Sequence, residues 1–225
     1  MASICGAPIK GSMLRVTKLD VCGVPVTGAS GLVYTTKGFV QVQMAPQYED
    51  GEEFFERTAD GTLCVNQKDD PILKRFQLTI DMCEIDPDGI SYVLSARELA
   101  TTGPVSGYGF AMSEGKPTNR FGLEVWQEVA GSGACDASGV QRYIYNVWPN
   151  VGASRIGNYT IENGRSTLQF IAETKAASSL WGNGPGAASW LPATGTTTLL
   201  STEHWAWNIT TVAPPTAQCG AGIVA

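Results

Sequence analysis

Short stretches in which hydrophobic and polar residues alternate dominate the chain and predict β-strands. In residues 76–82, Phe76, Leu78, Ile80 and Met82 alternate with polar residues, which is the period of two expected of a strand with one buried face. Similar patterns predict strands at residues 13–21, 39–44, 121–129, 142–148, 158–162 and 166–174. Between the last two, Ile161–Arg165 contains Asn-Gly, the dipeptide favoured in tight hairpin turns.

For the first two predicted strands, the sequence also predicts which side chains share a face. In residues 13–21, Leu14 and Val16 share one face, and the pattern shifts at Thr17 and Lys18 before Leu19 and Val21. In residues 39–44, one face is expected to carry Val40, Val42 and Met44, and the other to carry Phe39, Gln41 and Gln43.

One segment has the spacing of a helix. Asp86 is a suitable N-cap and Pro87 suits the first turn, and the residues expected on one apolar face are Ile90, Val93, Leu94 and Leu99. The predicted fold is therefore mainly β, a β-sandwich or barrel with one flanking α-helix, a long inter-strand loop and an extended C-terminal segment.

The long inter-strand loop, Ala45–Arg75, carries the charge imbalance of the chain. Residues 47–70 contain eight acidic and two basic residues, a net charge of −6, which equals the net charge of all 225 residues. Loops of this length are uncommon in compact domains and are usually functional. The alternative interpretation of the acidic block is a solvated loop.

Outside this block the chain is sparsely charged. Charged residues make up 16% of the sequence, against roughly 25% in typical domains. The first 46 residues are locally basic, with Lys10, Arg15, Lys18 and Lys37 against Asp20. A general nucleic-acid binder would normally be basic overall, so the composition argues against that class.

The sequence after Ala176 changes character. It contains Gly-rich, Thr-rich and Pro-rich stretches together with Trp181, Trp190, Trp205 and Trp207. We expect an extended segment over residues 186–225, attached to a β domain over residues 1–185. The tryptophans are interpreted as packing anchors, with a sugar-binding platform as the alternative.

No catalytic or metal-binding pattern is recognisable. The single histidine, His204, has no evident nucleophile or metal partner and is expected to be structural. The six cysteines are widely spaced without a zinc-binding pattern and are interpreted mostly as buried free thiols, with disulfides as the alternative. No signal peptide or membrane-spanning stretch is recognisable, which favours synthesis in the cytosol. We therefore expect a protein that is not an enzyme and needs no cofactor or metal.

The succession of these elements resembles the major tail tube proteins of long-tailed (siphovirus-type) bacteriophages, especially those of actinobacterial hosts. The resemblance covers about residues 10–185. It is carried by the strand ending in Val21-Cys-Gly-Val-Pro, the long acidic excursion, Lys74-Arg-Phe-Gln-Leu-Thr-Ile-Asp-Met, the Asp86 helix, Phe121-Gly-Leu-Glu-Val-Trp-Gln-Glu, and Gly164-Arg-Ser-Thr-Leu-Gln-Phe-Ile-Ala-Glu-Thr with Trp181-Gly-Asn-Gly-Pro.

The resemblance implies a structural virion protein of the phage tail, made in the bacterial cytoplasm. Six copies would form a ring, and rings would stack head-to-tail into a hollow tube through which genomic DNA leaves the capsid. Other tail proteins, such as the tape measure and terminator, would be further partners. DNA would be in transit only, and no membrane would be bound.

Two sets of candidate residues follow. The excursion would contact the adjacent ring, and the basic N-terminal region is its candidate partner; the inter-ring candidates are Glu49, Asp50, Glu52, Glu53, Phe54, Phe55, Glu56, Lys10, Arg15 and Lys18. A channel for DNA favours acids or few charges on its wall; the lumen candidates are Asp81, Glu84, Glu124 and Glu128, with ordinary solvated strand positions as the alternative.

Two other classes of function remain open from the sequence. A phage head decoration or head-to-tail joining protein would share the β-rich, low-charge composition without lining a channel. A carbohydrate-binding β-sandwich would use the tryptophans.

Overall fold

The computed structural model describes residues 6–84, 86–100, 107–161, 163–164, 166–178 and 199–219. Trp181, Trp190, Cys5 and the Trp181-Gly-Asn-Gly-Pro stretch lie outside these ranges. The described part contains one α-helix, α1 (Pro87–Leu94), and two short 3₁₀ helices at Gly28–Ser30 and Gly131–Gly133. Its strands are β1 (Ala7–Leu19), β2 (Val33–Thr36), β3 (Phe39–Glu49), β4 (Glu53–Arg57), β5 (Leu63–Lys68), β6 (Ile72–Met82), β7 (Arg97–Ala100), β8 (Tyr108–Ala111), β9 (Arg120–Ala130), β10 (Tyr143–Thr160), β11 (Thr167–Thr174) and β12 (Ala206–Thr210).

A single antiparallel sheet forms the body of the molecule. Its strands follow the order β2-β1-β9-β10-β11-β6-β3, and β12 adds to β10 beside β11. The predicted strands at residues 142–148 and 158–162 are parts of the single long strand β10, which links the two halves of the sheet. The predicted hairpin connects β10 to β11, with Thr160 opposite Thr167, although Glu162 and Arg165 lie outside the described residues.

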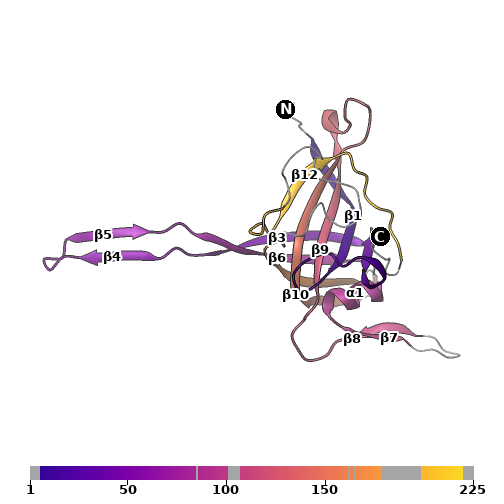
Figure 1. Cartoon of the computed structure of the whole chain (residues 1–225), viewed down its shortest axis with the longest axis horizontal. Helices are drawn as coiled ribbons and strands as arrows, with labels where there is room; N and C mark the ends of the chain where they lie inside the picture. The colour runs from indigo at the N-terminus through magenta and orange to yellow at the C-terminus, as the bar shows by residue number, and fades with distance from the viewer. Residues whose placement is uncertain are drawn as a thin grey trace.

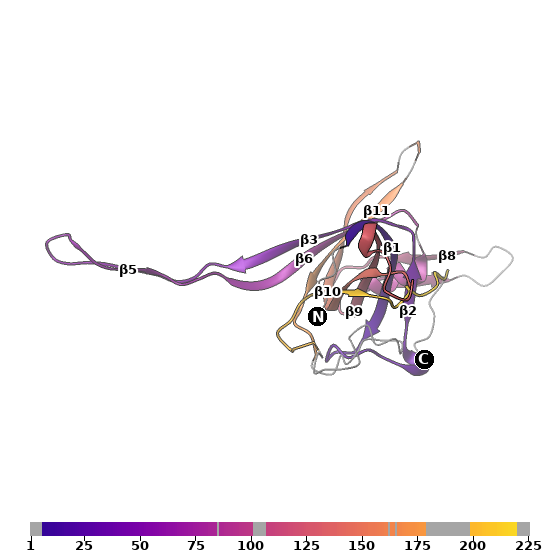
Figure 2. The same cartoon turned by 90° about the horizontal axis from the view of Figure 1, so that it is seen from above.

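The sheet curls so that its two halves enclose the main core. Leu14, Val125 and Leu123 from one half pack with Leu78, Ile80 and Phe170 from the other. The start of β3 lies directly over β1, since a Cβ added to Gly11 would be 2.6 Å from Cζ of Phe39. These contacts confirm the mainly β, sandwich-like fold with one flanking helix (Figures 1 and 2).

The other face of β1 is also buried. Met13, Leu19, Trp126 and Tyr145 form a second cluster beneath the C-terminal residues Ala177 and Leu199. Register shifts in the β1–β9 pairing near Ile9 and Ser12 show that β1 is irregular. Simple alternation therefore predicts its facing only in part: Leu14, Val16 and Leu19 are buried, whereas Val21 lies beyond the strand and is exposed.

A bulge changes the facing expected for β3. Phe39 pairs with Met82 and Gln41 pairs with Asp81, so Val40 is an extra residue without a partner across the ladder. Phe39, Val42 and Met44 consequently pack against the core, while Val40 is 47% exposed. The prediction that Val40 shares a face with Val42 and opposes Phe39 is wrong because the bulge reverses the alternation.

Helix α1 covers one end of the sheet, as predicted. Asp86 accepts a hydrogen bond from the backbone N–H of Asp88 at 3.1 Å, and Ile90, Val93 and Leu94 enter the main core. Ser95 ends the helix in the left-handed conformation. Leu99 belongs to β7, which pairs with β8, so its assignment to the helix face is wrong.

Residues 45–75 form a hairpin and not an irregular loop. Strands β3 and β6 extend beyond the body, with Glu49 opposite Ile72, and β4 and β5 continue the pairing to the turn. We call residues 48–74 the arm, and Figures 1 and 2 show that it projects far from the body. The sequence does not predict the strand pairing of the arm, because all of residues 48–74 except Gly51 are exposed. The arm strands therefore lack the hydrophobic alternation of a half-buried strand.

The described part of the C-terminal segment is extended, as expected, and adds to the body. Strand β12 pairs with the first half of β10, from Val147 opposite Ala206 to Tyr143 opposite Thr210. The chain then continues toward β2, where the Gln218 N–H donates to the Thr35 carbonyl at 3.0 Å.

Candidate assembly interface

The arm presents its acidic residues to solvent. Asp50, Glu52, Glu53 and Glu56 are exposed, and of the arm acids in the described structure only Glu49 forms an ion pair, with Lys74 at 3.1 Å. Surface ion pairs of this kind add little stability. The arm therefore keeps a concentrated negative charge that its own basic residues neutralise only in part.

Aromatic side chains accompany these acids near the end of the arm. Phe54 is 47% exposed and shares a face with Val65, which is paired with Glu56. Phe55 is 50% exposed on the opposite face, where the Arg57 guanidinium lies 5.2 Å from its ring centre. Both faces of the hairpin thus combine apolar surface with charge, a composition suited to a contact that buries them.

The turn at the end of the arm is held by Asp60. Its Oδ1 accepts hydrogen bonds from the Thr62 N–H at 3.1 Å and the Thr62 hydroxyl at 2.8 Å, and also from the Thr58 hydroxyl. The Thr58 hydroxyl and the two Thr62 groups lower the pKa of Asp60 to about 2. These bonds order the turn without any contact to the body.

All three predicted basic partners have a contact within the subunit, and two of these contacts are ion pairs. Lys10 forms an ion pair with Glu128 at 3.2 Å, and the Arg15 guanidinium binds both carboxylate oxygens of Glu124. Lys18 lies over the ring of Tyr92, 5.9 Å from its centre. Arg15 is therefore excluded as an inter-ring contact, because its side chain is only 13% exposed.

Glu124 is buried and cannot line a channel. It has no exposed surface, and its carboxylate also accepts a hydrogen bond from the hydroxyl of Tyr145. Burial and the nearby Glu124 carboxylate raise the pKa of Tyr145 well above its usual value. Burial by itself would lower the pKa of Arg15, but Glu124 raises it above the usual value. The lumen prediction for Glu124 is wrong, since alternation along β9 gives no sign that both of its faces are covered.

The other three lumen candidates retain solvent exposure and lie on different parts of the surface. Glu128 is partly exposed but is paired with Lys10. The exposed residue Glu84 accepts a hydrogen bond from the Thr36 hydroxyl at 3.0 Å. Asp81 lies on the outer face of β6, where it accepts hydrogen bonds from Gln41 on β3 and Gln169 on β11.

This outer face of β3, β6 and β11 is rich in side-chain amides, which the sequence reasoning missed. Its facing positions follow from the pairing: Gln43 opposite Thr79, Gln41 opposite Asp81, and Ala45 opposite Gln77. The charges on this face balance in number: Arg75 binds Glu173 at 2.7 Å. The exposed Arg155, opposite Ile171 on the other side of β11, carries the charge opposite to that of Asp81. The sequence signal that could have revealed this face was the set of polar residues that alternate with the core-facing residues of each strand.

His204 and Trp205, which were considered for catalysis and sugar binding, make packing contacts in the structure. His204 Nδ1 is 3.0 Å from the Thr174 hydroxyl, and its ring meets Phe76 edge-on, while burial lowers its pKa. Trp205 packs against the main core, as expected of an anchor, whereas Trp207 is 52% exposed. Within the described residues no group of His, Cys, Asp and Glu is placed to hold a metal ion.

The cysteines differ from expectation in their burial. Cys22, Cys64, Cys83, Cys135 and Cys219 are free and exposed, so their predicted burial is wrong. Each lies in a turn, an arm strand or an edge segment where no core covers it.

Comparison with known proteins does not place the chain in a family. No family model matches it, and no curated protein matches its sequence. Among the described residues, no helix combines the length and apolar composition that crossing a membrane requires.

Proposed function

We propose that this protein is a structural subunit of a phage tail tube. Six copies form a ring, and rings stack head-to-tail into the hollow tube that conducts genomic DNA from capsid to host. The protein is made in the bacterial cytoplasm and resides in the virion tail, where the tape measure and terminator proteins are further partners. The role is structural and involves no catalysis or cofactor.

The arm is the observation that carries this proposal. It is a paired, exposed hairpin with concentrated negative charge and exposed aromatic residues, projecting from a body that is nearly neutral. A contact between an arm and a different surface of the next copy is heterologous, and a heterologous contact that does not close generates a filament. The arm thus provides one of the two different surfaces that head-to-tail stacking requires.

The amide-rich outer face of β3, β6 and β11 supports the channel. A wall of lysine or arginine would bind DNA by releasing counterions from its phosphates. On this face Gln41, Gln43 and Gln77 predominate, and the neighbouring charges of Arg75 and Glu173 neutralise each other. The single remaining cation, Arg155, is offset in number by Asp81. We assign this face to the lumen, with Asp81 as its acidic residue, so that DNA slides along it without being held.

Negative-stain electron microscopy of the purified full chain tests the proposal. Tubes or six-fold rings are expected. The double variant Glu52→Lys and Glu53→Lys should give folded subunits that fail to stack, and Lys116→Glu, at an exposed site in another loop, is its control. Normal tubes from the double variant would refute the role of the arm. Monomers that bind glycans, or particles that decorate heads without forming tubes, would refute the tail tube function.

A further inference from the structure

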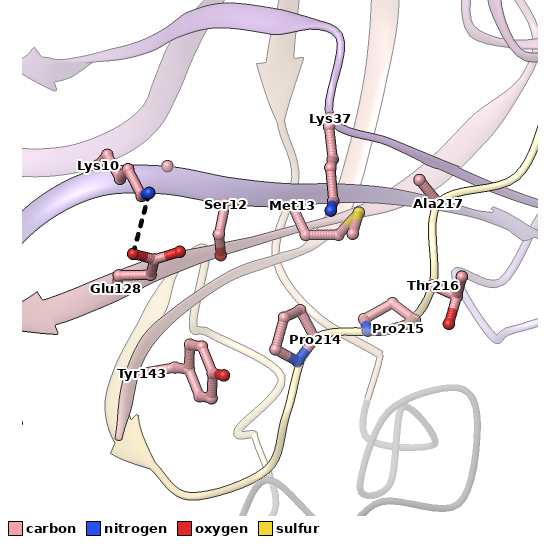
Figure 3. A pocket seen from close by; sticks show the side chains of 11 residues that line it. Lys10, Ser12, Met13, Lys37, Glu128, Tyr143, Pro214, Pro215, Thr216 and Ala217 are labelled. Carbon is pink, nitrogen blue, oxygen red and sulfur yellow. Dashed lines mark ion pairs between the residues drawn. The ribbon is translucent and has the colours of Figure 1, made fainter. Parts of the chain in front are cut away.

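A groove in the body lies between the first half of β1 and the C-terminal segment. It has a volume of about 490 Å³ and is lined by Lys10, Ser12, Lys37, Tyr143, Pro214 and Thr216 among others. In Figure 3, Lys37 extends over β1 toward Met13, and Tyr143 and Pro214 stand on the side of the C-terminal segment. The volume is within the range of roughly 300–1,000 Å³ that is usual for ligand clefts.

One edge of β1 is open along this groove. Strand β2 pairs with β1 only from Leu14 to Thr17, whereas β9 pairs with β1 from Ala7 to Leu19. In the part of the chain that the structure describes, no strand pairs with the second edge of residues 7–13. Unpaired backbone groups at a strand edge can accept another extended strand.

The charged residues that line the groove are Lys10, Lys37 and Glu128, so its lining is net positive. Lys37 is exposed and forms no ion pair with any described residue, while the Lys10 side chain remains 66% exposed beside Glu128. The apolar surfaces of Tyr143 and Pro214 lie across from these lysines. The groove therefore offers a strand edge, positive charge and apolar surface together.

We propose that this groove receives the arm of a second copy of the chain, an inference that rests on the proposed function and specifies its contact. The arm has the complementary properties: exposed Glu52, Glu53 and Glu56, which form no ion pair with any described residue, exposed Phe54, and the outer edges of β4 and β5, which pair only with each other among the described residues. The arm projects away from its own body (Figure 1), so under this proposal its end lies in the groove of another chain and not in its own.

Zero-length cross-linking with a carbodiimide tests the contact directly. The reagent joins a lysine amine to a carboxylate with loss of water, and mixing ¹⁵N-labelled with unlabelled full-length chains identifies links between copies. We expect mixed-isotope peptides that link Lys37 or Lys10 to Glu52, Glu53 or Glu56. The absence of such links, or links from the arm only to Lys116 or Lys175, would overturn the inference.

Electron microscopy of the same samples separates this inference from the proposed function. Tubes without arm-to-groove links would leave the tail tube function standing and overturn the groove assignment. Arm-to-groove links in samples without rings or tubes would support the groove and overturn the tube.

A charge exchange provides the second test. Lys37→Glu should raise the critical concentration for assembly roughly tenfold or more, because like charges then meet across the contact. Mixing this variant with the double variant Glu52→Lys and Glu53→Lys should restore assembly, since each chain then finds an oppositely charged partner. Unchanged assembly of Lys37→Glu, or behaviour equal to the Lys116→Glu control, would overturn the inference.

Discussion

Arg15 and Glu124 face each other on the adjacent strands β1 and β9 and bind through two hydrogen bonds. Nε and Nη2 of Arg15 each lie 2.5 Å from a carboxylate oxygen of Glu124. Trp126 covers the guanidinium, whose carbon is 5.2 Å from the ring centre. The pair is therefore an internal feature of the sheet, although the sequence places its members in two different candidate surfaces.

Breaking this pair should strongly destabilise the fold. In the folded chain the Glu124 side chain has no exposed surface and the Arg15 side chain is only 13% exposed. Glu124→Gln removes the negative charge that balances Arg15, and removing one member of a buried ion pair costs about 3–5 kcal/mol. We expect a loss of this size in the free energy of unfolding, measured with urea on subunits that are not assembled.

The exposed pair Lys10 and Glu128 provides the matched control. Both side chains retain solvent contact, and exposed pairs contribute about 1 kcal/mol or less. Glu128→Gln should therefore change unfolding only slightly. Equal effects of Glu124→Gln and Glu128→Gln would contradict the buried role of the Arg15–Glu124 pair.

The parts of the fold that the sequence predicts are those with a single buried face. Leu78, Ile80 and Met82 on β6 alternate with polar residues and are all buried in the core, and the Asp86 cap identifies the start of α1. Where a bulge adds a residue, as at Val40, the alternation reverses and the predicted facing fails.

Candidate surfaces were harder to predict because they depend on neighbours from distant segments. Glu124 alternates like an outward-facing residue, yet Arg15 and Tyr145 cover it from two other strands. The arm was recognisable as unusual by its charge, but its exposed strands lack the apolar face that reveals pairing. The groove beside Lys37 is lined in part by residues 214–217, which are distant in the sequence, so no local pattern predicts it.

The turn at Asp60 should remain ordered in acid. Its pKa in the folded chain is lowered to about 2 from 3.8, so its hydrogen bonds stabilise the turn fully above pH 3.8 and are lost as the pH falls through about 2. NMR titration should show Asp60 and the Thr62 amide shifting together near pH 2. Titration of Asp60 near pH 3.8, as in Asp60 of a denatured chain, would contradict the observed turn geometry.

Phe54 should affect assembly more than folding. Its side chain is 47% exposed in the subunit, so Phe54→Ala removes little buried surface from the monomer. Aromatic anchors at the centre of an interface commonly contribute 2 kcal/mol or more, roughly thirtyfold in affinity. We expect sedimentation velocity to show assembly at correspondingly higher concentration, with the melting temperature of the subunit nearly unchanged.

Phe55 provides the comparison for that experiment. It lies on the opposite face of β4 beneath Arg57, and Phe55→Ala should likewise weaken assembly if both faces of the arm are covered. Assembly that is unchanged in both variants would show that the arm ends freely in solvent.

A side chain at Gly89 should destabilise the fold, because the first turn of α1 lies against the ring of Tyr34. A Cβ at Gly89 would be 2.5 Å from Cγ of Tyr34, whereas a Cβ at Gly109 on β8 would meet no atom within 4 Å. Tyr34 is itself buried in the main core and cannot retreat without disturbing it. Gly89→Ala should therefore lower the free energy of unfolding by about 1–3 kcal/mol, as overpacking does, and Gly109→Ala should change it by about 0.5 kcal/mol or less. Urea unfolding of both variants checks the difference; a Gly89→Ala chain as stable as Gly109→Ala would mean that α1 does not pack on Tyr34 as closely as the structure shows.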